Sequence, residues 1–122
     1  MVHGFNDENK EKVEVIAGNV IRVKLEDSVP ANSAKTLTWQ YNLTENGYSK
    51  VDVLSYYQRL KTSGEYFYGG YIANYNYVFP NISITYTSNP DNEMLVNVSI
   101  NVFNNSSSTA NFEGGFSLIL LP

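Results

Sequence analysis

Apolar side chains recur at every second position along most of this chain, and this period predicts β-strands. The clearest run holds apolar residues at every even position from Met94 to Val102, with Asn97, Ser99 and Asn101 among the residues between them. Successive side chains of a strand point to opposite faces, so such a run predicts a strand with one buried face. The same alternation occurs at residues 21–25, 37–43, 51–53 and 82–86.

Sequences rich in Gly, Pro, Asn and Ser separate these runs and predict turns. They read SVPANSA, TENGYS, KTSG, SNPDNE and NNSSSTANFEGG. The pair Asn46-Gly47 predicts a β-hairpin with a type I′ turn, because both residues tolerate positive φ. Residues 51–62 are rich in β-branched and aromatic residues, which favours a strand over a short helix. Residues 116–121 are apolar at successive positions, so we expect cover on both faces, from the opposing sheet and from a neighbour.

About seven to nine short strands without a helix predict an all-β fold, an antiparallel β-sandwich of jelly-roll type. A chain of 122 residues is the size of one domain. The sandwich is expected to cover residues 16–122. Within it, Trp39 alternates with Leu37 and Tyr41 and is expected in the core.

Residues 1–15 are expected to form an extended N-terminal arm that anchors the protein in an assembly. Residues 7–14 hold six charged side chains and no periodic apolar face. A chain terminus of this kind becomes ordered only when it is tied down. The partner is another subunit or a larger assembly; the alternative is that the arm folds back on its own domain. The candidate anchor residues are Phe5, Asn6, Lys10, Lys12 and Val13.

Composition and charge argue against several function classes. The net charge is -4 and no basic stripe is present, which argues against nucleic-acid binding. The chain has no cysteine, so disulfides and thiol chemistry are excluded. The start lacks the pattern of a signal peptide, and no apolar run is long enough to insert into a membrane.

The sequence predicts no metal, no cofactor and no enzymatic activity. His3 is the single histidine, so a His-based metal site or a Ser–His pair is not expected. The acidic stretches NDEN (6–9) and PDNE (90–93) lack the spacing of an EF-hand. Carboxylates for glycoside hydrolysis exist, but nothing in the sequence selects a pair of them. They are Glu26, Glu45, Asp52, Glu65 and Glu113.

The stretch GEYFYGGYIANYNYVF, residues 64–79, concentrates seven aromatic side chains. The strand pattern places Tyr71, Tyr75, Tyr77 and Phe79 on one face. Aromatic residues are enriched both in protein interfaces and in surfaces that recognise ligands. Core or subunit interface is the favoured interpretation, and a glycan-binding platform is the alternative. The candidate surface consists of Tyr66, Tyr68, Tyr71, Tyr75 and Tyr77.

The order of several short motifs resembles small β-sandwich domains at the tips of phage fibres and related virion-surface proteins. These motifs are VPANSAKTLTW, NGYSKVDVLSYY and NVFNNSSSTANFEGGFSLILLP, and the likeness covers roughly residues 18–122. In such domains a Pro-Ala-Asn turn introduces one strand, a Gly-Tyr corner opens the next and an Asn-Ser turn precedes a final apolar strand. The opening GFNDENKEKVEV is similar to the start of small phage structural proteins, including head-fibre-like ones.

The resemblance implies a non-enzymatic bacteriophage structural protein on the virion surface. It would be a capsid decoration, a head fibre or a short tail appendage, since the long repetitive stalk of a complete tail fibre is missing. The implied partners are further copies of the chain, as a trimer, and other virion proteins bound through the arm. Residues 116–121 and the tyrosine-rich stretch are the candidate subunit interface. The alternative is a carbohydrate-binding tip that recognises a glycan on the host cell surface.

Overall fold

The computed structural model describes residues 10–60, 67–68, 72–73, 77–79 and 82–122, and side chains only within 11–60 and 82–122. Strands dominate, and the described part contains no α-helix; none of its helical turns could span a membrane. The elements are β1 (Lys10–Ala17), β2 (Val20–Val29), β3 (Ser33–Asn42), the 3₁₀ turn η1 (Thr44–Asn46), β4 (Lys50–Leu60), β5 (Phe67–Tyr68), β6 (Ile72–Ala73), β7 (Tyr77–Phe79), β8 (Ile82–Ser88), β9 (Met94–Asn104) and β10 (Ala110–Leu121).

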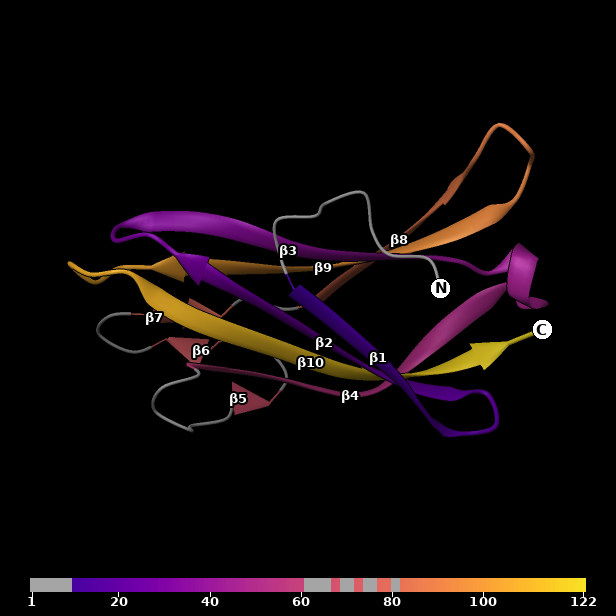
Figure 1. Cartoon of the computed structure of the whole chain (residues 1–122), viewed down its shortest axis with the longest axis horizontal. Coiled ribbons are helices and arrows are strands. Elements are labelled where there is room, and N and C mark those ends of the chain that lie inside the picture. Colours follow the sequence, from indigo (N-terminus) through magenta and orange to yellow (C-terminus); the bar gives the residue numbers. More distant parts are fainter. Residues whose placement is uncertain (1–9, 61–66, 69–71, 74–76, 80–81) are drawn as a thin grey trace.

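The strands form two antiparallel sheets that lie in layers (Figure 1). Sheet A has the order β1-β2-β10-β4-β5, and sheet B has the order β3-β9-β7-β6, with β8 also paired to β9. The chain crosses from one sheet to the other between β2 and β3, between β3 and β4, and between β9 and β10. The predicted all-β, antiparallel fold is confirmed, and the strand predicted at residues 51–62 is confirmed over residues 51–60, its described part.

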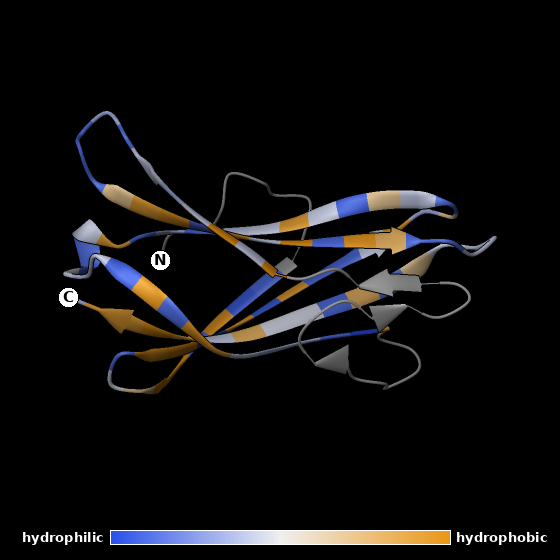
Figure 2. Ribbon diagram, turned by 180° about the vertical axis from the view of Figure 1, so that it is seen from behind, coloured by the Kyte–Doolittle hydropathy of each residue, from blue (hydrophilic) through white to orange (hydrophobic). Residues whose placement is uncertain are grey.

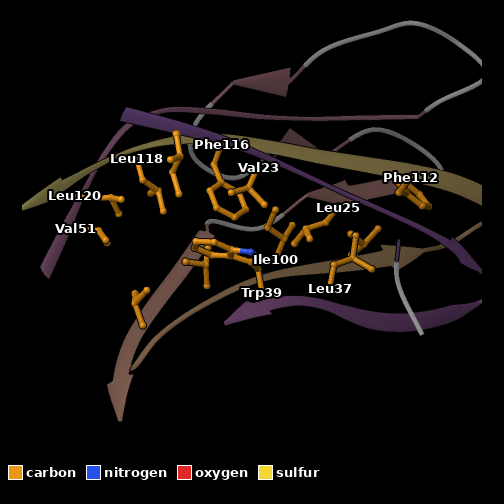
Figure 3. Close-up of a cluster of buried hydrophobic side chains, with 14 of the residues drawn as sticks. Val23, Leu25, Leu37, Trp39, Val51, Ile100, Phe112, Phe116, Leu118 and Leu120 are labelled. Atoms are coloured by element: carbon orange, nitrogen blue, oxygen red, sulfur yellow. The ribbon is translucent and has the colours of Figure 1, made fainter. Parts of the chain in front are cut away.

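The core lies between the sheets and consists of the apolar faces that the alternation predicted. Along the long strands, apolar residues alternate with polar ones (Figure 2). Trp39 is 1% exposed, stacks on Tyr41 at 5.4 Å and meets the edge of Phe116 at 5.8 Å between ring centroids. Burying each large apolar side chain contributes roughly 1.5–3 kcal/mol. Figure 3 labels ten of the core residues, among them Trp39, Ile100 and Phe116. The core residues include Ile21, Val23, Leu25, Leu37, Trp39, Leu43, Val51, Val96, Val98, Ile100, Val102, Phe112, Phe116, Leu118 and Leu120.

Strand β10 is the central strand of sheet A, between β2 and β4. Phe116, Leu118 and Leu120 are buried in the chain's own core, so these three residues are not an interface as predicted. Ile119 and Leu121 alternate with them and remain partly exposed. The opposing sheet thus covers one face of the final strand, as predicted, and the cover by a neighbour expected on its other face stays a prediction.

The hairpin predicted at Asn46-Gly47 is wrong. The chain forms η1 there and passes from β3 in sheet B to β4 in sheet A. Gly47 has φ 85°, whereas Asn46 is not among the residues with positive φ that a type I′ turn requires at both positions. Leu43, fully buried, draws the chain toward the core before the turn, and the Asn46 amide Nδ2 donates to the Asn42 carbonyl at 2.8 Å.

Residues 10–15 of the predicted arm lie in edge strand β1 of the sandwich. Strand β1 pairs with β2 from Lys10 opposite Glu26 to Ala17 opposite Val20. Val13 packs against the core, while charged residues alternate with it. An edge strand needs only one apolar contact face, and charges there discourage pairing with another chain. Order at residues 10–15 therefore requires no partner; residues 1–9 lie outside the described residues.

The tyrosine-rich stretch contributes strands to both sheets. Strand β5 lies beside β4 in sheet A, whereas β6 and β7 belong to sheet B. Strands β6 and β7 pair antiparallel, with Ile72 opposite Phe79 and Ala73 opposite Val78. The predicted single strand from residue 71 to residue 79 is therefore wrong. Period-two alternation cannot show where a chain of aromatic residues reverses direction.

Candidate binding grooves on the outer faces of the two sheets

The outer face of sheet A carries a groove of about 410 Å³, called here the sheet A groove. It spans β2, β10 and β4, the three strands at the middle of this sheet. Most of the lining side chains occupy the outward positions that alternate with core residues. The lining residues are Arg22, Lys24, Ser55, Tyr57, Gly115, Phe116 and Ser117.

Gly115 forms the floor of this groove because Tyr57 lies across it. The two residues are cross-strand neighbours in the pairing of β10 with β4. A Cβ atom at position 115 would lie 2.6 Å from Cζ and 2.8 Å from Oη of Tyr57. Only glycine leaves room for the ring, and glycine inside a strand often marks such a close approach.

Glu113 fixes the position of the Tyr57 ring. The Tyr57 hydroxyl donates to Oε2 of Glu113, and Arg59 Nη2 donates to Oε1 at 3.0 Å. Glu113 is only 2% exposed. Burial by itself would raise the pKa of Glu113, but the hydrogen bonds from Tyr57 and Arg59 and the positive charges of Arg59 and Lys24 lower it below its ordinary value. Glu113 is therefore a carboxylate at neutral pH, and the ring beside it is held rigidly.

Positive charge gathers on the β2 side of the sheet A groove. Lys24 is half-buried, and Lys12 on β1 lies directly opposite it. Within the described residues, Lys24 has no carboxylate within ion-pair distance. Arg22 contacts Glu14 at 3.5 Å, and both side chains are nearly half exposed. Like charges directly opposite each other destabilise a sheet, so Lys12 and Lys24 repel each other. The attraction of Lys24 to the Glu113 carboxylate and the contact of Arg22 with Glu14 offset part of this repulsion.

The outer face of sheet B carries a second groove, of about 310 Å³, and its lining is uncharged. Gln40 Nε2 donates to Asn97 Oδ1 at 2.8 Å, and Asn97 Nδ2 donates to Thr87 Oγ1 at 3.1 Å. These bonds join β3, β9 and β8 across the face. The lining residues of this sheet B groove are Thr38, Trp39, Gln40, Thr87, Asn97 and Ser99.

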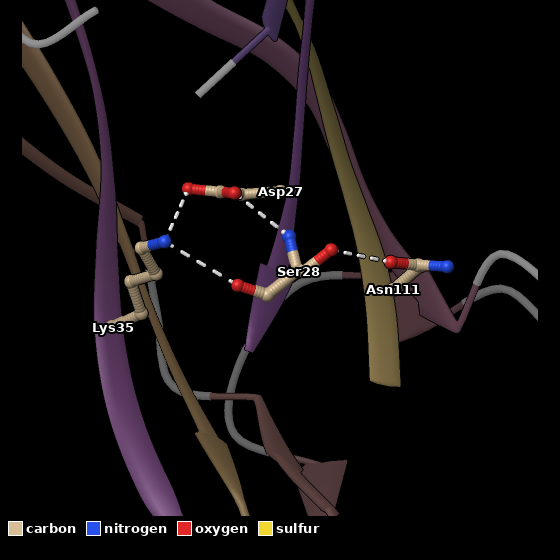
Figure 4. Close-up of polar contacts among 4 residues, drawn as sticks. All are labelled: Asp27, Ser28, Lys35 and Asn111. Atoms are coloured by element: carbon tan, nitrogen blue, oxygen red, sulfur yellow. Dashed lines mark hydrogen bonds and ion pairs between the residues drawn. The ribbon is translucent and has the colours of Figure 1, made fainter. Parts of the chain in front are cut away.

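A polar cluster ties the two sheets together at one end (Figure 4). Lys35 on β3 lies 2.8 Å from Oδ2 of Asp27 on β2, and it donates to the Ser28 carbonyl at 3.4 Å. The Ser28 hydroxyl donates to Asn111 Oδ1 at 2.7 Å. The cluster thus joins β2 to β3 in the other sheet and to β10 in its own sheet.

The predicted site residues that the structure describes lie in three separate strands. In the tyrosine-rich stretch, Tyr68 and Tyr77 belong to strands β5 and β7 of different sheets. Tyr66, Tyr71 and Tyr75 lie outside the described residues, as do Phe5 and Asn6 of the predicted anchor. Lys10, Lys12 and Val13 lie in β1.

Two of the acidic residues that the sequence singled out are cross-strand neighbours, and the other described ones lie in separate elements. Glu113 and Glu26 are neighbours between β10 and β2, whereas Glu45 is in η1 and Asp52 is in β4. Glu65 and the stretch NDEN lie outside the described residues.

In PDNE, Glu93 accepts hydrogen bonds from the amides of Asn89 and Asn42, which lower its pKa. No cluster of three or more potential metal-binding acidic or histidine side chains occurs in the part that the structure describes.

The sequence analysis missed the sheet A groove. Its clearest signal was Gly114-Gly115 inside the final strand, because glycine in a strand interior often marks a close approach of another group. A Cβ at Gly114 would lie 2.5 Å from Ile100 Cδ1 in the core, and one at Gly115 would meet Tyr57 on the opposite face. These glycines were assigned to a turn.

Comparison of the chain with protein-family models, with curated proteins and with solved structures gives no match.

Proposed function

We propose that this chain is a non-enzymatic structural protein of a bacteriophage virion, placed on the surface of the capsid or tail. The observation that carries the proposal is the position of the three motifs on which the resemblance rests. VPANSA leads into β3 at Ser33, NGYS leads into β4 at Lys50, and NNSSSTA leads into β10 at Ala110. Each motif thus stands before the strand that it introduces in the fibre-tip domains.

The state of Glu113 argues against a general-acid role for this side chain. This residue is the one buried carboxylate among the described residues. Its pKa is lowered and both of its oxygens accept hydrogen bonds, so it cannot serve as a proton donor near neutral pH. The rest of the described chain consists of long paired strands, a rigid body suited to binding a partner.

For the strand order we propose a jelly roll. Strands β2 and β3, in opposite sheets, pair with β10 and β9 respectively. Two consecutive strands near the start of the chain thus lie along the last two strands, as in the rolled double strand of a jelly roll. An experimental structure that places residues 61–81 would test the remaining order.

Docking on the virion is assigned to residues 1–9, and three copies are proposed to associate. Deletion of residues 1–9 leaves β1 intact and is expected to abolish co-sedimentation with phage capsids or tails.

The chain of residues 1–122 should have three times its 13.7 kDa mass in solution. Antibodies against the chain should label intact virions in electron micrographs. Absence of labelling together with a monomeric mass would contradict the proposal.

Carbohydrate recognition on the host surface is the second candidate function. The observation that favours it is the pair of grooves lined by hydroxyl, amide and tyrosine side chains. Such groups supply the adaptable hydrogen bonds and flat rings that recognition surfaces use. Retention of the isolated chain on cell-wall glycans would support this function, and its loss on Tyr75→Ala would locate it in the tyrosine-rich stretch.

A further inference from the structure

We infer that the sheet A groove binds a sugar unit that carries an anionic group. The inference deepens the second candidate function and rests on it, but it is independent of any position on a virion. It places recognition on β2, β4 and β10 rather than in the tyrosine-rich stretch.

The cations of the groove define the charge of the ligand. Arg22 and Lys24 are two residues apart on β2, so both side chains stand on the same outer face. No acidic residue lines the groove. Among the described residues, Lys24 has no carboxylate within ion-pair distance and stands opposite Lys12. A bound anion would relieve this repulsion, whereas a neutral ligand would leave it in place.

The remaining lining residues favour a sugar over a bare anion. The ring of Tyr57 lies over Gly115, where it offers an immobile flat surface next to the two cations. Its hydroxyl is already used by Glu113, so the ring does not have to be ordered on binding. Ser55 and Ser117 lie opposite each other across β4 and β10 and supply hydroxyls for the hydroxyls of a sugar. A volume of about 410 Å³ lies within the range of small-molecule sites, roughly 300–1,000 Å³.

The sheet B groove lacks this combination. Its lining carries no charge, and its amides Gln40 and Asn97 are already bonded across the strands. An anionic ligand is therefore expected to bind in the sheet A groove and not in the sheet B groove.

The test is a titration of the full-length chain, by isothermal calorimetry or amide NMR shifts, with glucuronate, glucose 6-phosphate, glucose, inorganic phosphate and acetate. We expect the two anionic sugars to bind more tightly than the other three probes. The stronger of the two identifies the anionic group as carboxylate or phosphate. Binding should weaken as salt is raised, because the cations are partly exposed.

Variants locate the site. Lys24→Gln and, separately, Arg22→Gln should each weaken binding of the anionic sugars about tenfold, the effect of losing one hydrogen bond to a charged group. Lys50→Gln is the matched control, since Lys50 is an exposed lysine at the far end of β4, roughly 20 Å along the strand from Tyr57. It should leave binding unchanged. Melting temperatures of all variants establish that each is folded.

Three results would overturn the inference. One is a wild-type chain that binds neither anionic sugar; another is phosphate or acetate binding as tightly as the sugars. The third is full binding by both the Lys24 and the Arg22 variants. If the chain binds glycans and loses them on Tyr75→Ala but not on Lys24→Gln, the second candidate function stands and the groove assignment fails.

Discussion

At the scale of single residues, the outer face of sheet A is organised by one buried carboxylate. Glu113 is shielded by Tyr57 and Arg59, which are 56 and 54 residues away in the sequence. Hydrogen bonds to an ionised group contribute roughly 1.5–3 kcal/mol each, and leaving a buried partner unpaired costs a similar amount. Glu113 therefore connects β4 to β10 as well as fixing the wall of the groove.

Replacing Glu113 should change the dependence of stability on pH. The folded-state pKa of Glu113 is lower than its ordinary value of 4.5, so its stabilisation is complete above that value and is lost as pH falls through the folded pKa. At pH 7 we expect Glu113→Gln to unfold more easily by about 1–3 kcal/mol. The difference from the wild type should shrink below pH 4.5. Urea unfolding followed by Trp39 fluorescence at pH 7, 5 and 3 measures it, and a difference that stays constant would refute the assignment.

A side chain at Gly114 would overlap the end of the Ile100 side chain, which occupies its inward position. We expect Gly114→Ala to destabilise the chain by about 1–3 kcal/mol, the usual effect of overpacking a core. Gly114→Ala combined with Ile100→Val, which shortens the obstructing side chain, should recover part of the loss. The measurement is again urea unfolding, and the absence of any recovery would show that the overlap is not the cause.

At the scale of elements, one asparagine organises the turn between β9 and β10. Asn104 is fully buried, and its amide Nδ2 donates to the carbonyls of Val29 and Ser108 at 2.9 Å. Its Oδ1 accepts from the backbone N–H of Ser106 at 3.0 Å and from the Ser106 hydroxyl at 2.6 Å. The turn is thus held by a side chain in place of backbone pairing, and it is also joined to the end of β2.

Asn104→Ala should therefore destabilise the chain by about 1–3 kcal/mol, since it leaves buried backbone groups unpaired. Asn105→Ala is the control, because Asn105 is exposed and adjacent. Thermal unfolding by circular dichroism should show a lower melting temperature for the first variant only. Equal melting temperatures of the two variants would mean that water replaces the hydrogen bonds of the Asn104 amide without loss of stability.

The edge strand β1 gives the second prediction at this scale. Deleting residues 1–17 removes β1 and exposes the β2 edge, whereas deleting residues 1–9 does not. An uncovered edge pairs with other chains. We expect the longer deletion alone to lower the melting temperature and to form larger species in size-exclusion chromatography. Monodisperse behaviour of both truncations would show that β1 is dispensable.

At the scale of the whole molecule, the two sheets are joined by the apolar core and by the ion pair of Asp27 with Lys35. The side chains of this pair are 12% and 28% exposed, so it is better shielded than the pair of Arg22 with Glu14. Neutralising one partner of a partly buried ion pair lowers the stability of the fold more than neutralising one partner of an exposed pair.

Asp27→Asn should consequently lower stability by about 1 kcal/mol, and Glu14→Gln, which neutralises the exposed pair, by less than about 0.5 kcal/mol. The double variant Asp27→Asn with Lys35→Met should be more stable than the sum of the single changes predicts, because no unpaired charge remains. A double-mutant cycle by chemical denaturation measures the coupling. A coupling of zero would show that the two charges do not interact across the sheets.

The period-two pattern by itself determined that the chain is all-β and which face of each long strand is buried. Strand alternation is local, so Ile21, Trp39 and Val98 could be assigned to buried strand faces without knowing their neighbours. Only the tertiary structure decided which strands pair, because pairing depends on contacts between residues far apart in the chain. For this reason Gly47 was misassigned to a hairpin, residues 10–15 to an anchoring arm and residues 71–79 to one strand. For the same reason the sheet A groove, which joins β2, β4 and β10, could not be predicted from any one segment.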